Sequence, residues 1–390
     1  MKTALLLDTS FSSQPIVRAL SKLSIDVVAV GSRKDDALAM GACEHIAADY
    51  SDRETLASIV LQLRPDFIVP GCNDVSYESY CALKRTPPER CKLIDSESLI
   101  AQLHNKRLFR QICREHKVSA PLVFDGPSEV RCSDYPVIVK PVDGFSGKGV
   151  SIVEAGNSEL LSAIRKAEAV SRIGSSVIEQ FVSGPLYSYS AFLCRGRIYA
   201  GFLVKEFSFA NPFAVDTSFL VVDEGLEQKI VHELQSLISA LNLQEGLLHV
   251  QFIEAKTGVS LIEVTRRCPG DLYANLVQIS TGFDYAAAYV APFLGLSVSP
   301  HQRHEARCTS TVVRHTATAD REGFLKDVVI DEQASLVALT PVLRAGDMMT
   351  ASQNFRVAVG FFRTQTHSDL DYVLARAKGR NLISVRSFEK

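Results

Sequence analysis

The sequence predicts a chain that combines α/β and α+β domains, and three observations lead to this class. Over residues 1–100, apolar runs typical of buried strands alternate with amphipathic helical segments, which is the order of a parallel sheet covered by helices. After residue 130, the expected strands come in pairs joined by short turns, as in antiparallel hairpins. The 390 residues are too many for one core and suit two or three domains.

Composition and charge narrow the class of protein. Apolar residues make up 46% and charged residues 22% of the chain, which is ordinary for a globular protein. A formal net charge of −2 gives no reason to expect nucleic acid or a membrane as partner. The sequence has no run of about 18 apolar residues, so we expect no membrane span. The nine cysteines form no CxxC pair, which favours reduced thiols and a cytoplasmic location.

Residues 1–100 predict a parallel sheet with helices on both faces. Its expected elements include strands at Ala4–Leu7, Val27–Val30 and Phe67–Val69 and a helix at Asp35–Gly41. The first turn, Asp8–Ser13, contains no glycine, which argues against a dinucleotide fingerprint. Asn73 and Asp74 follow the third of these strands, where such sheets bind ligands, although turn formation is the commoner role of such residues.

The stretch Tyr135–Glu154 predicts two strands around a loop rich in glycine. Lys140 and Pro141 end the first strand, and Gly144–Gly149 contains glycine, serine and lysine. Such a loop exposes backbone N–H groups and allows close approach of an anion, while the lysines add positive charge. The loop matches neither a P-loop nor GxGxxG, and a plain hairpin turn is its commonest alternative role. The prediction of a phosphate-covering flap therefore depends on neighbouring motifs.

Two segments beside this loop support the phosphate hypothesis. Asn105 is an expected N-cap of a helix with Leu108, Phe109, Ile112 and Cys113 on one face. Lys106 lies in the first turn of that helix, where a lysine is unfavourable to the helix dipole, so a solvated lysine and a functional one remain alternatives. The strand Ser176–Phe181 offers backbone groups that could contact an adenine ring.

A later hairpin supplies acidic and amide groups. Its two strands are expected at His249–Glu254 and Val259–Val264. Gln251 and Glu263 lie one on each strand, so their side chains could converge on one ion. Alternation along the strand places Glu263, Thr265 and Arg267 on one face. Magnesium prefers oxygen ligands and commonly shares them with nucleotide phosphates, whereas the alternative is a solvated strand face.

In combination, these motifs resemble the ATP-grasp superfamily of ATP-dependent carboxylate ligases. The branch that they resemble contains biotin carboxylase, carbamoyl phosphate synthetase and the bacterial L-amino acid ligases, and the resemblance covers about residues 1–300. Members carry one lysine in the opening helix and another before the flap, which match Lys106 and Lys140. The hinge motif Glu-x-aromatic-aliphatic-x-Gly matches Glu179–Gly184, and Ile-Glu-x-Asn-x-Arg matches Ile262–Arg267.

The resemblance implies domains, cofactors and site residues. It implies a Rossmann-like domain at 1–100, an ATP-grasp domain at 101–300 with halves 101–183 and 184–300, and a β-rich subdomain at 301–390. ATP and Mg²⁺ or Mn²⁺ are the implied cofactors. The implied ATP-binding residues are Lys106, Lys140, Ser146, Gly147, Lys148, Gly149, Glu179, Gln180, Phe181 and Val182. The implied catalytic residues are Arg267 and Lys140, the metal ligands are Gln251, Glu263 and Thr265, and the weaker substrate candidates are Lys205, Arg266 and Asp271.

Three positions depart from the family pattern. Gln251 stands where most members have glutamate, although relatives like carbamoyl phosphate synthetase have glutamine there. Thr265 replaces asparagine, and its hydroxyl is a poorer oxygen ligand for a metal. Leu186 replaces a glutamate that contacts ribose in many members. These departures put the individual metal ligands and the ribose contact in doubt.

The leading functional hypothesis is an ATP-dependent carboxylate–amine ligase that forms an amide, peptide-like bond through an acylphosphate. Its substrates would be an amino acid or similar small acid and an amine, with the flap excluding water and Arg267 stabilising the acylphosphate. One alternative is carboxyphosphate chemistry of the biotin carboxylase type. A second alternative, motivated by the three departures, is a nucleotide-binding protein without turnover. Family analogy suggests a homodimer, and the sequence does not identify the acid or the amine.

Overall fold

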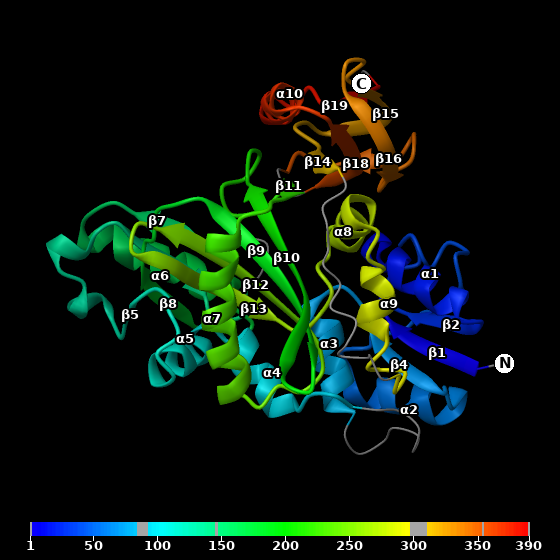
Figure 1. Ribbon diagram of the computed structural model, residues 1–390, viewed down its shortest axis with the longest axis horizontal. Helices are drawn as coiled ribbons and strands as arrows, with labels where there is room; N and C mark the ends of the chain where they lie inside the picture. The colour runs from blue at the N-terminus through cyan, green and yellow to red at the C-terminus, as the bar shows by residue number, and fades with distance from the viewer. Residues whose placement is uncertain (1, 84–92, 145–146, 297–309, 353–354, 389–390) are drawn as a thin grey trace.

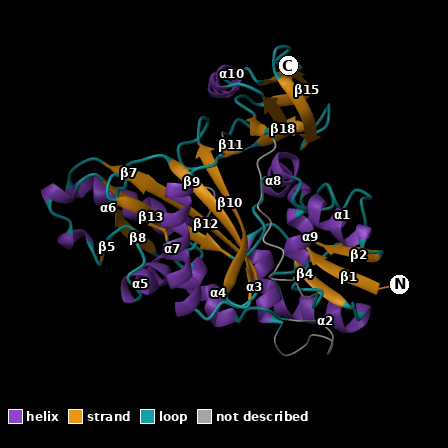
Figure 2. Ribbon diagram, in the orientation of Figure 1, coloured by secondary structure: helices purple, strands orange, loops and turns teal. Residues whose placement is uncertain are grey.

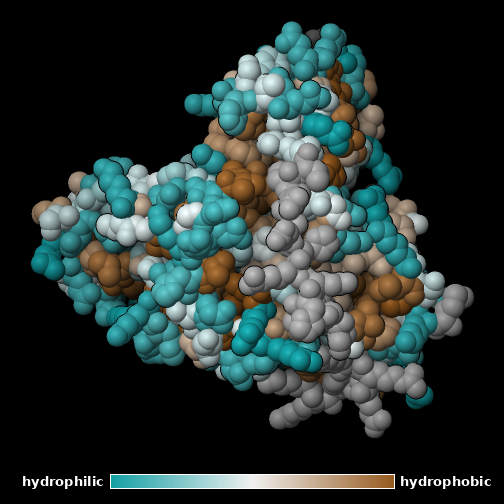
Figure 3. Space-filling view, in the orientation of Figure 1, coloured by the Kyte–Doolittle hydropathy of each residue, from teal (hydrophilic) through white to brown (hydrophobic). Residues whose placement is uncertain are grey.

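The computed structural model describes residues 2–83, 93–144, 147–296, 310–352 and 355–388. Three bodies surround the centre of the molecule (Figure 1): the N-terminal segment in blue, the flap region in cyan and green, and the C-terminal segment in orange and red. Polar and apolar side chains alternate in small patches over the face shown in Figure 3. Within the described ranges, no helix has both the length and the apolar content required to cross a membrane.

The N-terminal segment forms a parallel sheet between helices (Figure 2), which confirms the predicted Rossmann-like architecture. Its strands are β1 (Lys2–Leu7), β2 (Ile25–Val30), β3 (Glu44–Ile46) and β4 (Phe67–Pro70), in the order β3-β2-β1-β4. Its helices are α1 (Gln14–Lys22), α2 (Arg53–Leu63), α3 (Asp74–Ala82) and α4 (Glu97–His104). The leucines of β1 are fully buried because helices cover both faces of the sheet.

The helix expected at Asp35–Gly41 is wrong, because this segment is a series of turns. The Thr9 hydroxyl donates a 2.7 Å hydrogen bond to the Asp36 carboxylate, and the Leu38 N–H donates to the Thr9 carbonyl oxygen at 2.9 Å. Short acidic side chains favour such local alternatives to helical hydrogen bonds. The segment therefore folds over the end of β1.

The flap region is an antiparallel sheet covered by one helix. Its strands are β5 (Val123–Phe124), β6 (Val137–Pro141), β7 (Ser151–Val153) and β8 (Ser176–Gln180), in the order β5-β8-β6-β7. Helix α5 (Lys106–Glu115) precedes it, and α6 (Asn157–Val170) packs on it through Leu160, Ala163 and Ala167. The pairing of Val139 with Ser151 confirms that the glycine-rich loop joins two antiparallel strands.

A single eight-stranded sheet runs from the centre into the C-terminal segment. Its order is β13-β12-β9-β10-β11-β14-β18-β16, in which β14 (Thr311–Thr318), β18 (Arg356–Thr364) and β16 (Ser335–Pro341) belong to the C-terminal segment. The central strands are β9 (Leu186–Cys194), β10 (Arg197–Phe207), β11 (Thr217–Leu220), β12 (Gly246–Ala255) and β13 (Gly258–Thr265). The helices that flank them are α7 (Glu224–Ala240), α8 (Tyr273–Thr281) and α9 (Tyr285–Val290). The β-rich C-terminal segment is therefore hydrogen-bonded to the central sheet through β11 and β14.

The C-terminal segment adds a small second sheet and one helix. Its elements are β14 (Thr311–Thr318), β15 (Gly323–Ile330), β16 (Ser335–Pro341), β17 (Met348–Met349), β18 (Arg356–Thr364), α10 (His367–Lys378) and β19 (Ile383–Ser387). Strands β17, β15 and β19 form the second sheet, and α10 packs near β18 and β14. A capping box between Thr366 and Asp369 fixes the start of α10.

Candidate active site beside the flap

Lys106 joins three segments that are far apart in the sequence. The Asn105 side chain caps α5 by accepting hydrogen bonds from the N–H groups of Arg107 and Leu108, both at 3.1 Å. Lys106 Nζ donates to the Gly144 carbonyl oxygen at 2.7 Å and lies 3.8 Å from Glu263 Oε1. The start of the glycine-rich loop and the acidic hairpin therefore meet at this one lysine.

Lys140 lies in a buried ion-pair cluster that the sequence motifs did not reveal. Its Nζ is 2.7 Å from Glu179 Oε2, and Arg110 Nε is 2.9 Å from Glu179 Oε1. The Glu179 side chain is completely buried, which opposes ionisation, yet Arg110 and Lys140 lower the pKa of Glu179 to about 2. Burial lowers the pKa of Lys140, and Glu179 opposes that shift. This cluster joins α5, β6 and β8.

The sequence pattern did not predict Arg110 as a buried site residue, because it placed Leu108 on the buried face of α5. Leu108 is 39% exposed, whereas Arg110 is buried and also donates to the Ile262 carbonyl oxygen at 2.7 Å. Arg110 follows Lys106 by four residues, so both side chains lie on the same face of the helix. That spacing was the available signal.

The hairpin β12–β13 places Gln251 directly opposite Glu263, as its spacing predicted. Gln251 Nε2 donates a 2.7 Å hydrogen bond to Glu206 Oε2 of β10. Burial, with a smaller contribution from Asp271, raises the pKa of Glu206 to about 7. Glu206 was not among the predicted site residues, and an acidic residue within the apolar run LVKEF was its only signal.

This donor set fits a magnesium ion that shares its ligands with a nucleotide. Among the described residues, no group of three or more His, Cys, Asp and Glu side chains could hold a metal. Mg²⁺ commonly binds one or two protein carboxylates and takes its other ligands from water and phosphate. Glu263, whose side chain is 40% exposed, and the amide oxygen of Gln251 match that requirement.

Thr265 and Arg267 both contact Asp74 at the start of α3. Arg267 Nε is 2.8 Å from Asp74 Oδ1, and the Thr265 hydroxyl donates to the same oxygen at 3.4 Å. Burial opposes ionisation of Asp74, but Arg267 and then His104 hold its pKa far below the usual range. Asn73 instead caps α3 by accepting from the Ser76 N–H at 2.9 Å. Of the two polar residues that follow β4, Asp74 therefore lies at the site and Asn73 has a structural role.

The weaker substrate candidates are placed differently from one another. Arg266 is only 1% exposed, since it is paired with Asp95 at 2.9 Å and donates to the Leu247 carbonyl oxygen at 2.7 Å. Arg266 therefore lies on the opposite side of the chain from Arg267 and is not brought to the site. Asp271 pairs with Arg314 Nη1 at 2.9 Å. Lys205 Nζ lies 5.8 Å from the centroid of the Tyr187 ring.

The glycine-rich loop and the hinge can be followed in part. Gly147 and Gly149 have φ values of 69° and 73°, a left-handed conformation that favours glycine, and Lys148 is exposed. Ser146 lies outside the described residues. The N–H groups of Gln180 and Phe181 already donate to Leu122 and Pro136 carbonyl oxygens at 2.9 and 3.2 Å. Val182 follows β8, and Leu186 begins β9.

A narrow pocket, which we call the flap cleft, lies where the start of the glycine-rich loop meets α3, α4 and β13. Its lining residues are Asp74, Glu78, His104, Asp143, Gly144, Arg172 and Glu263. Its volume of about 10 Å³ is about that needed for one water molecule. The charged side chains around the flap cleft therefore contact one another directly.

Comparisons with known proteins agree with this architecture. The ATP-grasp domain family matches residues 133–275. The formate-dependent phosphoribosylglycinamide formyltransferase of Prochlorococcus marinus (strain AS9601) is 26% identical over 370 residues, which cover 89% of this chain and 90% of that protein. The predicted resemblance to the ATP-grasp superfamily is confirmed by this match over residues 133–275.

Solved structures share the fold over nearly the whole chain. The L-amino acid ligase from Bacillus licheniformis has a TM-score of 0.81 at 17% identity, covering 100% of this chain and 99% of that one. The biotin carboxylase domain of Hydrogenobacter thermophilus 2-oxoglutarate carboxylase, solved with MgADP and bicarbonate, has a TM-score of 0.76 at 13% identity. That match covers 98% of this chain and 91% of the other. The comparisons support an ATP-dependent bond-forming enzyme of the ATP-grasp ligase type.

Proposed function

We propose that this protein is an ATP-dependent carboxylate–amine ligase that activates a small acid, such as an amino acid, as an acylphosphate. The observation that carries the proposal is the meeting of Lys106, the Gly144 carbonyl oxygen and Glu263 at the start of the glycine-rich loop. A cation and a carboxylate at such a loop suit the terminal phosphates of ATP and their counter-ion. The names of two proteins reported above also support a carboxylate substrate, since one is an L-amino acid ligase and the other is a formate-dependent formyltransferase.

The residues take distinct roles in this proposal. Lys106 and Lys140 attract phosphate oxygens, while Gly147 and Gly149 allow the loop backbone to approach them. Glu263 with Gln251 would hold Mg²⁺ or Mn²⁺, which when bound offsets phosphate charge. The Thr265 hydroxyl already donates to Asp74 and accepts from the Arg267 N–H at 3.3 Å, so we assign it a positioning role.

Arg267 is the residue that we propose to act on the acid. A carboxylate oxygen of the acid attacks the terminal phosphorus and ADP leaves; the amine nitrogen then attacks the acyl carbon and phosphate leaves. Arg267 would stabilise the negative charge that develops in both steps, and its pairing with Asp74 fixes its orientation. Asp74, which pairs with Arg267, and Glu78, which lines the flap cleft with Asp74, provide carboxylates for the ammonium group of an amino acid.

Formate is a second candidate acid, because the Prochlorococcus relative is named for it and matches over about nine-tenths of both chains. The proposed chemistry is unchanged, since formate also carries a carboxylate that ATP can phosphorylate. Bicarbonate represents the carboxyphosphate alternative, which the biotin carboxylase domain motivates.

Phosphate release from ATP tests the proposal. The purified chain is incubated with ATP and Mg²⁺ and with each amino acid, formate or bicarbonate, with and without a panel of amines. A ligase releases phosphate and forms an amide only when its acid and amine are both present. Tight ATP binding without release for any pair would instead support a nucleotide-binding protein without turnover.

A further inference from the structure

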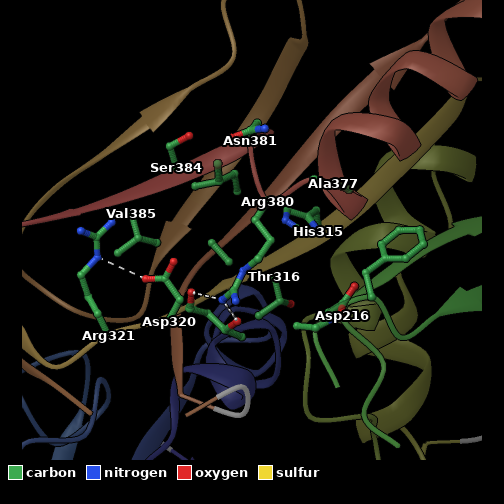
Figure 4. Close-up of a pocket in the computed structure, with 16 residues that line it drawn as sticks. Asp216, His315, Thr316, Asp320, Arg321, Ala377, Arg380, Asn381, Ser384 and Val385 are labelled. Carbon is green, nitrogen blue, oxygen red and sulfur yellow. Dashed lines mark hydrogen bonds and ion pairs between the residues drawn. The ribbon is translucent and has the colours of Figure 1, made fainter. Parts of the chain in front are cut away.

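A second cavity among the described residues lies in the C-terminal segment, away from the flap cleft. Its volume is about 280 Å³, close to the lower end of the usual range for small-molecule sites. The loop after β10, strand β14, the end of α10 and strand β19 contribute its walls. We call it the C-terminal cavity, and Figure 4 shows its lining side chains.

Arg380 is the cation of this cavity without a carboxylate partner. It lies just after α10 with a φ of 58°, and its Nη2 donates to the carbonyl and hydroxyl oxygens of Thr318, both at 3.0 Å. Among the described residues, no ion pair involves Arg380. Figure 4 shows its side chain extending across the cavity towards Thr316. The guanidinium is thus oriented by neutral oxygens and keeps donors for an anionic group.

Carboxylates and neutral polar groups line the same space. Asp320, which contacts the neighbouring Arg321 at 3.3 Å, and Asp216 contribute carboxylates. His315 is 5% exposed, and its Nδ1 is 2.8 Å from the Thr217 hydroxyl, whereas its Nε2 has no protein partner among the described residues. Apolar side chains complete the lining at Ala317, Ala377, Ile383 and Val385.

We propose that the C-terminal cavity binds a small zwitterion, such as a free α-amino acid, with its carboxylate on Arg380 and its ammonium group near Asp320. The apolar wall would receive the side chain of this ligand, and His315 and Ser384 would complete its hydrogen bonds. The site is separate from the proposed acceptor site at Arg267, and its binding requires no turnover.

The cavity is connected to the glycine-rich loop by the segment 208–216. At one end, Asp216 is 5% exposed, and its carboxylate accepts a 2.7 Å hydrogen bond from the Ala210 N–H. The Asp216 carbonyl oxygen also accepts from the Thr316 N–H at 2.7 Å. At the other end, a Cβ on Gly147 would collide with the Phe213 side chain and lie 2.7 Å from its carbonyl oxygen. One compact segment therefore lines the cavity and packs against the flap.

This connection gives the bound zwitterion a regulatory role. A ligand that contacts Asp216 and Ala210 changes the free energy of the 208–216 segment, and Phe213 transmits that change to Gly147. The ligand can alter the loop only through such differential contacts. We therefore expect the C-terminal cavity to be an effector site for the flap.

Binding of single amino acids to the full chain tests the site. Each L-amino acid, its N-acetyl derivative and its carboxamide are added at millimolar concentration, and binding is followed by calorimetry and by hydrogen exchange. We expect at least one amino acid to bind and to protect residues 377–385, whereas its two derivatives, which each lack one charge, bind at least about tenfold more weakly.

Three variants locate the binding. Arg380→Gln should weaken it at least about tenfold, and Ser384→Trp, which fills the cavity, should abolish it. Arg386→Gln removes the same charge from β19 outside the cavity and should leave the affinity unchanged. No binding by any amino acid, binding that survives both cavity variants, or protection confined to residues 263–273 would each overturn the site. Binding without altered exchange in residues 208–216 would overturn the coupling.

Discussion

The flap cleft and the C-terminal cavity differ in how their charged groups are satisfied. Around the flap cleft, Lys106 contacts Glu263, and Arg267 is paired with Asp74, so little free volume remains. In the C-terminal cavity, Arg380 is bonded to neutral oxygens and about 280 Å³ is open. A ligand of the first site must replace protein partners and so must move side chains, whereas the second site is already formed.

The largest expected effect is a loss of turnover when charged side chains at the flap cleft are replaced. Glu263→Gln keeps the shape of the side chain but removes the charge that would hold the metal, so turnover should fall by about 10³-fold or more. Lys106→Ala should have a comparable effect, because it removes a phosphate contact. The measurement is phosphate release with the acid and amine found for the wild type.

Matched stability data decide how these variants are interpreted. Neither Glu263 nor Lys106 is fully buried, so thermal unfolding should change little. Near-wild-type turnover in either folded variant would contradict the proposed site.

The next effect concerns the buried cluster behind Lys140. Glu179→Ala leaves Arg110 and Lys140 as uncompensated buried cations, so the free energy of unfolding should fall by about 3–5 kcal/mol. Urea unfolding measures this change. A loss below about 1 kcal/mol would show that water reaches the cluster and that Lys140 is more available to phosphate than the structure indicates.

The next prediction is a pH dependence of stability that arises from His315, which lines the C-terminal cavity. Burial, followed by Arg314 and Arg380, lowers the pKa of His315 to about 3 from 6.5. As the pH falls, His315 therefore gains its proton in the unfolded chain before it does so in the folded chain, and this favours unfolding. The stability contributed by neutral His315 is fully present above about pH 6.5 and is lost as the pH falls towards 3.

Comparison with a variant isolates the contribution of His315. In His315→Gln, the slope of unfolding free energy against pH should be smaller by up to about 1.4 kcal/mol per pH unit between pH 4 and 6. Urea unfolding at several pH values measures both slopes. Parallel curves for the two proteins would mean that His315 is protonated equally in the folded and unfolded states.

The smallest expected effect is at an exposed ion pair. Arg386 Nε lies 2.5 Å from Asp327 Oδ1, and both side chains are substantially exposed. Arg386→Gln should therefore change the free energy of unfolding by less than about 1 kcal/mol. A larger loss in urea unfolding would indicate that the pair joins β15 and β19 more strongly than exposed pairs usually do.

Patterns that are local in sequence predicted local structure well. The strand–helix alternation at the N-terminus, the Asn105 cap and the opposition of Gln251 and Glu263 followed from spacing alone. The prediction of a helix at Asp35–Gly41 was wrong because Thr9 provides hydrogen-bond partners to this segment. Thr9 lies outside the segment, so the local sequence pattern could not include it.

Interactions between distant segments could not be predicted in the same way. Arg110 and Glu179 are 69 residues apart, and Glu206 and Gln251 are 45 apart, so neither contact leaves a periodic signal. Family motifs supplied Lys106, Lys140 and Glu263 individually, but not the protein partners that offset their charges. The C-terminal cavity could not be predicted from sequence for the same reason, because its walls come from four separate segments.

The continuous sheet through β11 and β14 has a consequence for dissecting the molecule. All four residues of β11 are buried, and β14 is its hydrogen-bonded neighbour on one side. Removing the chain from residue 310 onwards would expose the backbone N–H and C=O groups of β11, together with the buried side chains of Phe219 and Leu220. Exposed edges of this kind recruit strands from other molecules. A fragment cut between the second and third predicted domains should therefore aggregate, so the C-terminal segment protects the central sheet from self-association.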